Sequence, residues 1–159
     1  MTPVRSFLEW LSNTGTIVYI RDSSYGMPAV QSVHLVGLTM LLAGILVLNL
    51  RLTGVGMMDW SLAAVERQLR TWMWVGVTFV LGSGALMFLG NPAKYLASGP
   101  FQFKMACLAL AIVCQFWLFR RFFRSEPTVR PRPLNIAVAV LSLTLWFSVG
   151  WAGRVIAFV

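Results

Sequence analysis

The chain has 159 residues and a formal net charge of +8. Its residues are 58% hydrophobic and 11% charged, whereas soluble domains are about 45–50% apolar and about 25% charged. The composition therefore excludes an ordinary soluble domain and predicts a membrane protein. In a soluble protein this charge would indicate nucleic-acid binding. Here most arginines lie in short loops between apolar segments, where they orient a chain in the bilayer, and we expect no nucleic-acid partner.

The first segment of the chain is amphipathic. Apolar residues recur at helical spacing at Val4, Phe7, Leu8 and Leu11, with polar residues between them. This pattern predicts a helix over about 3–20 that lies along the membrane surface. A cap packed over the end of a helix bundle would have the same pattern.

Four longer apolar segments follow, at about 29–51, 71–90, 101–121 and 134–157. Each is close to the roughly 20 residues that cross about 30 Å of hydrocarbon. Only helices satisfy the backbone of such a segment inside lipid, and short loops favour antiparallel neighbours. The sequence therefore predicts an all-α membrane protein with one transmembrane domain over 1–159. This domain is a four-transmembrane-helix bundle with the N-terminal amphipathic surface helix.

Small residues recur inside the predicted spans. Where bulky side chains are missing, two membrane helices can approach each other closely, so such positions are typical of helix contacts. The candidates are Gly37, Gly44, Gly76, Ser83, Gly150 and Gly153.

Basic residues predict the orientation in the membrane, because cytoplasmic loops are enriched in Lys and Arg. The loops after the first and third spans share one side and hold Arg51, Arg67, Arg70, Arg120, Arg121, Arg124, Arg130 and Arg132. The other side holds Arg5, Arg21, Lys94, Lys104 and Arg154. We therefore expect a multi-pass protein of a bacterial inner membrane with both termini in the periplasm.

Three basic side chains fall inside the predicted spans, although charge is costly there. His34 lies about one turn after the start of the first span, Lys104 about one turn after the start of the third, and Arg154 near the end of the fourth. Because the fourth span runs opposite to the other two, all three reach the same depth near the periplasmic face. The five acidic residues lie outside the spans. Glu9 or Asp22 could reach Lys104 and Arg154 from the outer surface, or an anionic ligand could balance them.

This pattern predicts a site for haem b or quinone. A neutral imidazole is a good axial ligand for haem iron, so His34 is the candidate metal ligand, while Lys104 and Arg154 would pair with the propionates. Met87 and Met105 are candidates for the second axial ligand, which could also be a histidine from a second copy or a partner. A quinone would need His34 only as a hydrogen-bond partner.

Other interpretations stay open. Copper would suit His34, Met87, Met105 and Cys107, because soft ligands select Cu(I), but the methionines are scattered without a Met-x-x-Met cluster. Each of the three basic residues could instead have a structural role. Lys104 could snorkel to the interface, whereas Arg154 and His34 could bond to neighbouring main chain.

Several short motifs occur in order along the chain. They are Gln-Ser-Val-His-Leu-Val-Gly-Leu at 31–38, Leu-Arg-Leu-Thr-Gly at 50–54, Asn-Pro at 91–92, Phe-Lys at 103–104 and Gly-Arg-Val-Ile-Ala at 153–157. The chain thereby resembles an uncharacterised bacterial family of small four-helix inner-membrane proteins, which is distantly similar to copper-resistance-D-type and b-type cytochrome membrane domains. The resemblance implies four spans and raises haem and copper as ligands. The single histidine departs from a di-haem cytochrome pattern.

The functional expectation is a small integral membrane subunit associated with redox chemistry, which binds haem b or quinone near the periplasmic face. With so little mass outside lipid, we expect it to act with other membrane subunits or as a homo-oligomer, and not to be catalytic alone. One alternative is a non-catalytic accessory or anchor subunit of a larger complex. Another is a small-molecule or copper permease.

Overall fold

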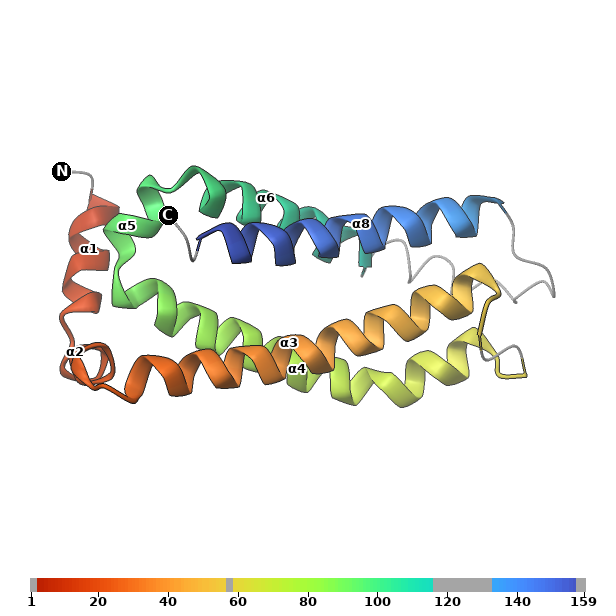
Figure 1. Cartoon of the computed structure of the whole chain (residues 1–159), viewed down its shortest axis with the longest axis horizontal. Helices are drawn as coiled ribbons and strands as arrows, with labels where there is room; N and C mark the ends of the chain where they lie inside the picture. Colours follow the sequence, from red (N-terminus) through yellow and green to blue (C-terminus); the bar gives the residue numbers. More distant parts are fainter. Residues whose placement is uncertain (1–2, 57–58, 116–132, 157–159) are drawn as a thin grey trace. The chain divides into compact units, whose positions relative to one another are not determined.

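The computed structural model describes residues 3–56, 59–115 and 133–156. This part of the chain is all-α, as predicted (Figure 1). Its seven helices are α1 (Pro3–Ser12), α2 (Gly15–Asp22), α3 (Gly26–Thr53), α4 (Leu62–Gly90), α5 (Pro92–Ala97), α6 (Gly99–Val113) and α8 (Pro133–Ile156). The chain divides into two compact units, Met1–Leu41 with Trp74–Ser98 and Leu42–Met73 with Gly99–Val159.

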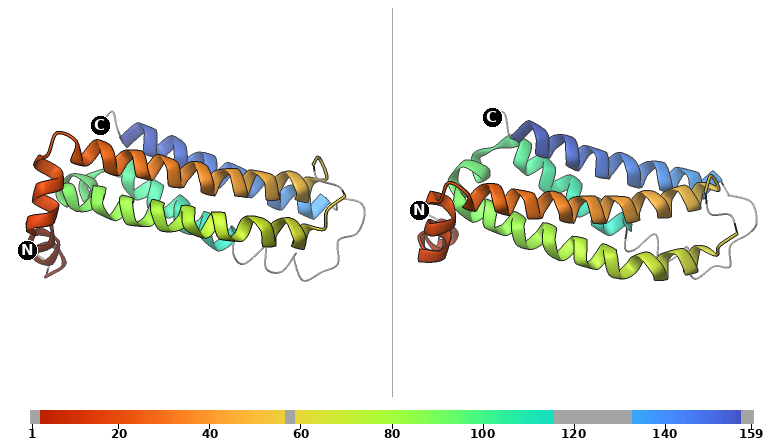
Figure 2. Two further views of the ribbon diagram at one scale, coloured as in Figure 1. Left: turned by 90° about the horizontal axis from the view of Figure 1, so that it is seen from below. Right: turned by 60° about the horizontal axis from the view of Figure 1, so that its bottom comes forward.

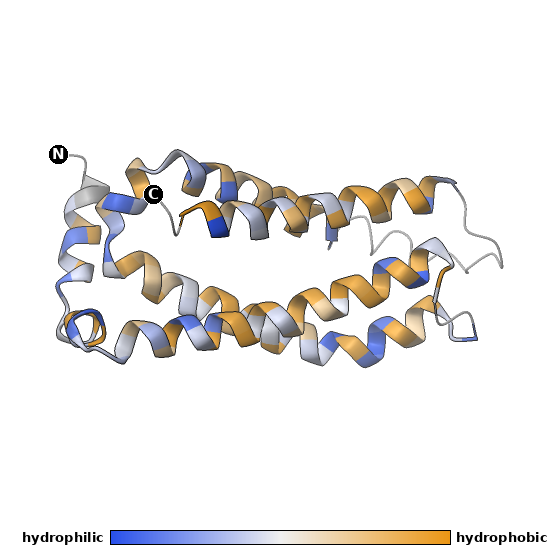
Figure 3. Cartoon of the chain, viewed as in Figure 1, coloured by the Kyte–Doolittle hydropathy of each residue, from blue (hydrophilic) through white to orange (hydrophobic). Residues whose placement is uncertain are grey.

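Three helices of the described part, α3, α4 and α8, are long and apolar enough to cross a membrane, and α6 is a shorter apolar helix. Hydrophobic residues predominate along all four (Figure 3). Large apolar side chains stay exposed on them, including Leu35 at 63% and Phe147 at 76%, as lipid contact requires. These features confirm a multi-pass membrane protein. The third predicted span extends to 121, and its residues after 115 lie outside the described part.

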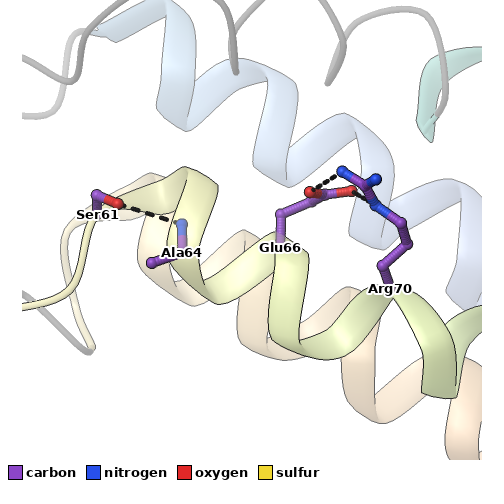
Figure 4. A network of polar contacts seen from close by, with 4 residues as sticks. All are labelled: Ser61, Ala64, Glu66 and Arg70. Carbon is purple, nitrogen blue, oxygen red and sulfur yellow. Dashed lines mark hydrogen bonds and ion pairs between the residues drawn. The ribbon is translucent and has the colours of Figure 1, made fainter.

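The first helical turns of α4 precede the predicted span. The helix begins at Leu62, nine residues before 71. The Ser61 hydroxyl accepts a hydrogen bond from the Ala64 N–H at 3.2 Å, which satisfies one main-chain donor at this helix end (Figure 4). One turn later Arg70 donates two hydrogen bonds to Glu66, at 2.8 and 2.7 Å. The first nine residues of α4, which include this ion pair, thus precede 20 residues that match the hydrocarbon thickness.

The N-terminal segment forms two helices instead of the single helix expected over about 3–20. Ser12 donates its hydroxyl to the Glu9 carbonyl at 2.9 Å, and Thr14 donates to the Leu11 carbonyl at 2.7 Å. Such side-chain bonds compete with the main-chain bonds that would continue a helix. The break separates α1 from α2 (Figure 2), and α1 packs against both α2 and α5.

The second unit has its core where α6 and α8 lie side by side (Figure 1). Alanines are fully buried on both helices, with Ala111 and Ala139 at 0% exposure, so the two backbones approach closely. A hydrophobic cluster in the same unit joins α8 to the end of α3 and the start of α4. Its members are Leu48, Leu52, Leu62, Val65, Val138 and Ala139.

Helix α3 ends at a glycine in the left-handed region, Gly54, with φ of 77°. The Val55 N–H bonds to the Leu50 carbonyl at 3.1 Å, and the Gly54 N–H bonds to the Arg51 carbonyl at 3.2 Å. This pair of bonds is the Schellman motif, which satisfies the last carbonyls of a helix. The Arg51 side chain also donates to the Trp60 carbonyl at 2.8 Å. These bonds therefore end α3 at a defined residue, Thr53.

Candidate functional site

Two glycines bring α3 and α4 together in the first unit (Figure 2). A methyl group added at Gly37 would lie 2.6 Å from Cβ of Phe79 and 3.0 Å from the Gly76 carbonyl oxygen. A methyl group at Gly76 would lie 2.9 Å from both the Gly37 carbonyl oxygen and the Leu41 nitrogen. The two backbones are thus in direct contact, as predicted for small residues at these positions. Because the two backbones cross so closely here, side chains that lie one helical turn from the crossing can reach each other.

His34 is the side chain that the crossing places against α4. It lies three residues before Gly37, on the same face of α3. Its Nδ1 atom is 2.8 Å from the hydroxyl oxygen of Ser83. Ser83 is buried, at 5% exposure, and the imidazole is half-buried. The histidine therefore has a defined partner on the neighbouring helix.

The direction of this hydrogen bond follows from the single proton of the Ser83 hydroxyl. That hydroxyl donates to the main-chain carbonyl of Phe79, four residues earlier in α4. With its proton directed at Phe79 the hydroxyl accepts from His34, and the imidazole tautomer that fits this arrangement carries its proton on Nδ1. In a neutral imidazole the lone pair is consequently on Nε2. Metal-binding histidines are oriented in the same way, by donating the other ring N–H to an acceptor.

Beyond Ser83, helix α4 places a glycine against the imidazole ring of His34. A methyl group at Gly84 would lie 3.5 Å from Cε1 of His34, so the glycine borders the imidazole directly. Met87 is half-buried and lies four residues after Ser83, on the same face of α4. The predicted second ligand is therefore one helical turn from the partner of His34.

Lys104 and Arg154 both belong to the second unit. The Nζ atom of Lys104 lies 3.5 Å from the position that a Cβ of Gly153 would occupy. The ammonium group is thus packed against α8 beside Arg154, in a helix pair whose described sequences hold no acidic residue. The predicted small residue Gly153 provides the space, whereas Gly150 has no atom within 4 Å of its would-be Cβ and makes no such contact.

The predicted site residues are thus distributed over both units. His34 and Met87 lie in the first, and Lys104, Met105 and Arg154 lie in the second. Met105 is 46% exposed and points away from the face of its neighbour Lys104. The common pocket stays a prediction. Among residues 3–56, 59–115 and 133–156, no three His, Cys, Asp or Glu residues gather as a metal site.

Two polar features were not anticipated from the sequence. Ser83 was expected only to line a helix contact, and its role as the partner of His34 follows from the crossing at Gly37 and Gly76. The second feature is a buried network in the second unit, where Asn49 bonds to Ser142. A polar residue near the end of an apolar segment is the signal that would have indicated this network.

Comparisons with known proteins define the family of the chain without defining its activity. No curated protein and no solved structure matches it. The expected similarity to copper-resistance-D-type and b-type cytochrome membrane domains is not among the findings, whereas the expected membership of a family without known activity is confirmed. The chain belongs to the family of unknown function DUF6644, which matches residues 7–159.

Proposed function

We propose that this protein is a small membrane subunit that binds a redox cofactor, haem b, through Nε2 of His34. The observation that carries the proposal is the hydrogen bond from Nδ1 of His34 to Ser83. It favours the tautomer in which Nε2 holds the lone pair, the form in which a histidine can ligate haem iron. A half-buried histidine that only filled space would not need this orientation.

Haem b would supply one-electron transfer, and the protein would bind and orient it. His34 would ligate the iron, and Ser83 would hold the imidazole in place. Met87, one turn from Ser83, is the candidate second ligand, and a His34 from a second copy is the alternative. Lys104 and Arg154 would pair with the propionates, because both side chains are cationic.

Quinone is the second candidate, and the same tautomer favours it. An unprotonated Nε2 can accept the hydroxyl proton of a quinol in a hydrogen bond, and this requires no second axial ligand. A quinone site would therefore require fewer protein ligands than a haem site. Both candidates depend on His34 and Ser83, but only haem gives a Soret band.

The proposal places the chain as a four-span bundle in a bacterial inner membrane, with both termini in the periplasm. The apolar helix α6 would be the visible part of the third span. On α1 the rings of Phe7 and Trp10 stack at 6.1 Å between centroids and are 59% and 68% exposed. Exposed aromatic pairs suit the membrane interface, which supports a surface helix. A reporter fused within 121–132 should read as cytoplasmic, and a periplasmic signal would contradict this orientation.

An absorption spectrum of the purified protein in mild detergent tests the haem proposal. We expect a Soret band and a dithionite-reduced α band that disappear in His34→Ala. Ser83→Ala should weaken haem binding by about 10–100-fold, as does the loss of other groups that orient a metal ligand. Ser32→Ala and Thr78→Ala are the matched controls. These hydroxyls are exposed and donate only within their own helices, at 2.9 and 3.0 Å, so haem content should not change.

The outcomes separate the candidates. A colourless protein that retains an extractable quinone, lost in His34→Ala, would replace haem by quinone at the same site. A preparation with neither ligand, obtained from cells that make both, would refute the redox proposal. Co-purifying membrane subunits in that preparation would favour the accessory or anchor role.

A further inference from the structure

The second unit contains a chain of hydrogen bonds that is sealed from its surroundings. Asn49 of α3 is 0% exposed, Ser142 of α8 is 1% exposed, and Gln115, two residues after α6, is 6% exposed. The Nδ2 atom of Asn49 lies 3.4 Å from Oγ of Ser142, and this Oγ lies 3.2 Å from Oε1 of Gln115. The network therefore joins three segments of the chain inside an apolar core.

The donors and acceptors of this network can be counted. Nδ2 of Asn49 donates to the Ile45 carbonyl at 2.8 Å and to Oγ of Ser142. The Ser142 proton goes to Oε1 of Gln115. Reversing the Asn49 amide would set two oxygen atoms against each other at Ile45, so the orientation is fixed. Oδ1 of Asn49 is then left without a donor among the described residues.

A complementary group lies one helical turn from the network. Trp146 follows Ser142 by four residues on α8, on the same face, and is 6% exposed. Its indole Nε1–H has no acceptor in the described part of the chain. One buried acceptor and one buried donor in the second unit thus lack partners among the described residues. Neither lipid nor an apolar side chain can satisfy them.

We propose that one buried water molecule bridges these two groups. The water donates to Oδ1 of Asn49 and accepts from Nε1 of Trp146. Buried waters typically make two to four such bonds to polar groups that would otherwise be unpaired. The near-complete burial of Asn49, Ser142 and Trp146 leaves no opening for a larger ligand, and all three are uncharged, so a metal or anion is not favoured. This site is independent of His34 and of the redox proposal.

The water completes a hydrogen-bonded connection between α3, α6 and α8. In a chain that runs from Trp146 through water to Asn49, Ser142 and Gln115, each member donates one hydrogen bond to the next. In lipid, where main-chain groups are already bonded within helices, such side-chain links determine which helix faces meet. We therefore expect the water to be a structural water that stays bound in the folded second unit.

Nuclear magnetic resonance of protein labelled with ¹⁵N-tryptophan in detergent micelles tests the proposal. The Trp146 indole signal is assigned through bonds and checked with Trp146→Phe. We expect a cross-peak between the indole proton of Trp146 and water in the wild-type protein. Asn49→Leu removes the acceptor for the water, and the cross-peak should be lost. Trp151, on the same helix and 61% exposed, is the matched control whose signal should be equal in both proteins.

Two results would overturn the proposal. One is a wild-type Trp146 indole proton without any cross-peak to water, which would show that no water is bound there. The other is a cross-peak that persists unchanged in Asn49→Leu, which would show that the water does not bridge the two residues. If Asn49→Leu does not fold, Asn49→Ala removes the same oxygen atom and is measured in its place.

Discussion

Substituting Gly76 by alanine tests the helix crossing that positions the candidate site. The added methyl group would lie 2.9 Å from the Gly37 carbonyl oxygen and the Leu41 nitrogen, and 3.2 Å from Cβ of Leu41. Ordinary contact begins at 3.4 Å, so α3 and α4 must separate by about 0.5 Å or distort, and the opposing atoms are mostly main chain. Overpacking of this kind costs about 1–3 kcal/mol. The unfolding equilibrium constant should therefore rise about 5–150-fold.

The matched control is Gly82→Ala on the same helix, because no atom lies within 4 Å of a Cβ at that position. Reversible unfolding of both variants in mixed detergent micelles, followed by circular dichroism, gives the two free energies of unfolding. The first unit should also lose the contact between His34 and Ser83, so Gly76→Ala should reduce ligand retention and Gly82→Ala should not. Equal stability of the two variants would refute the close crossing.

Three further outcomes follow from the described contacts. Glu66→Gln removes the exposed ion pair with Arg70 and should leave the thermal midpoint unchanged within error, since exposed pairs contribute little; a large loss in a melting curve would contradict this. Lys104→Gln should lower the haem content of the purified protein several-fold, as measured by its Soret absorbance, whereas Lys94→Gln, at an exposed position of α5, should not. A nitroxide at position 10 in place of Trp10 should report interfacial depth by electron paramagnetic resonance, and an aqueous value would argue against a surface helix.

The helical class and the apolar segments could be predicted because they depend on composition and length alone. The predicted first and last spans, at 29–51 and 134–157, agree closely with α3 and α8. Boundaries were less predictable where polar residues decide them. Ser61 begins α4 before the apolar segment, and the hydroxyl of Ser12 ends α1 inside the expected surface helix.

The candidate site was only partly predictable, because spacing gives the depth of a residue but not its neighbour. His34 was singled out as the only histidine of the chain. Its partner Ser83 is 49 residues away in sequence, and their contact depends on which faces of two helices meet. Asn49 was missed for a similar reason. It lies within an apolar segment where only the three-dimensional packing reveals Ser142 as its partner.

The glycine-terminated end of α3 has a consequence for the membranes in which the protein can reside. The apolar segment at 29–51 is about 35 Å long as a helix, against about 30 Å of hydrocarbon. The left-handed Gly54 holds the final turn closed, so the helix cannot shorten by fraying at that end. A thinner bilayer must therefore be met by tilting or by local thickening of the lipid. This mismatch would make the protein sensitive to lipid chain length. Bilayer thickness would therefore influence the regions of a membrane in which the protein accumulates.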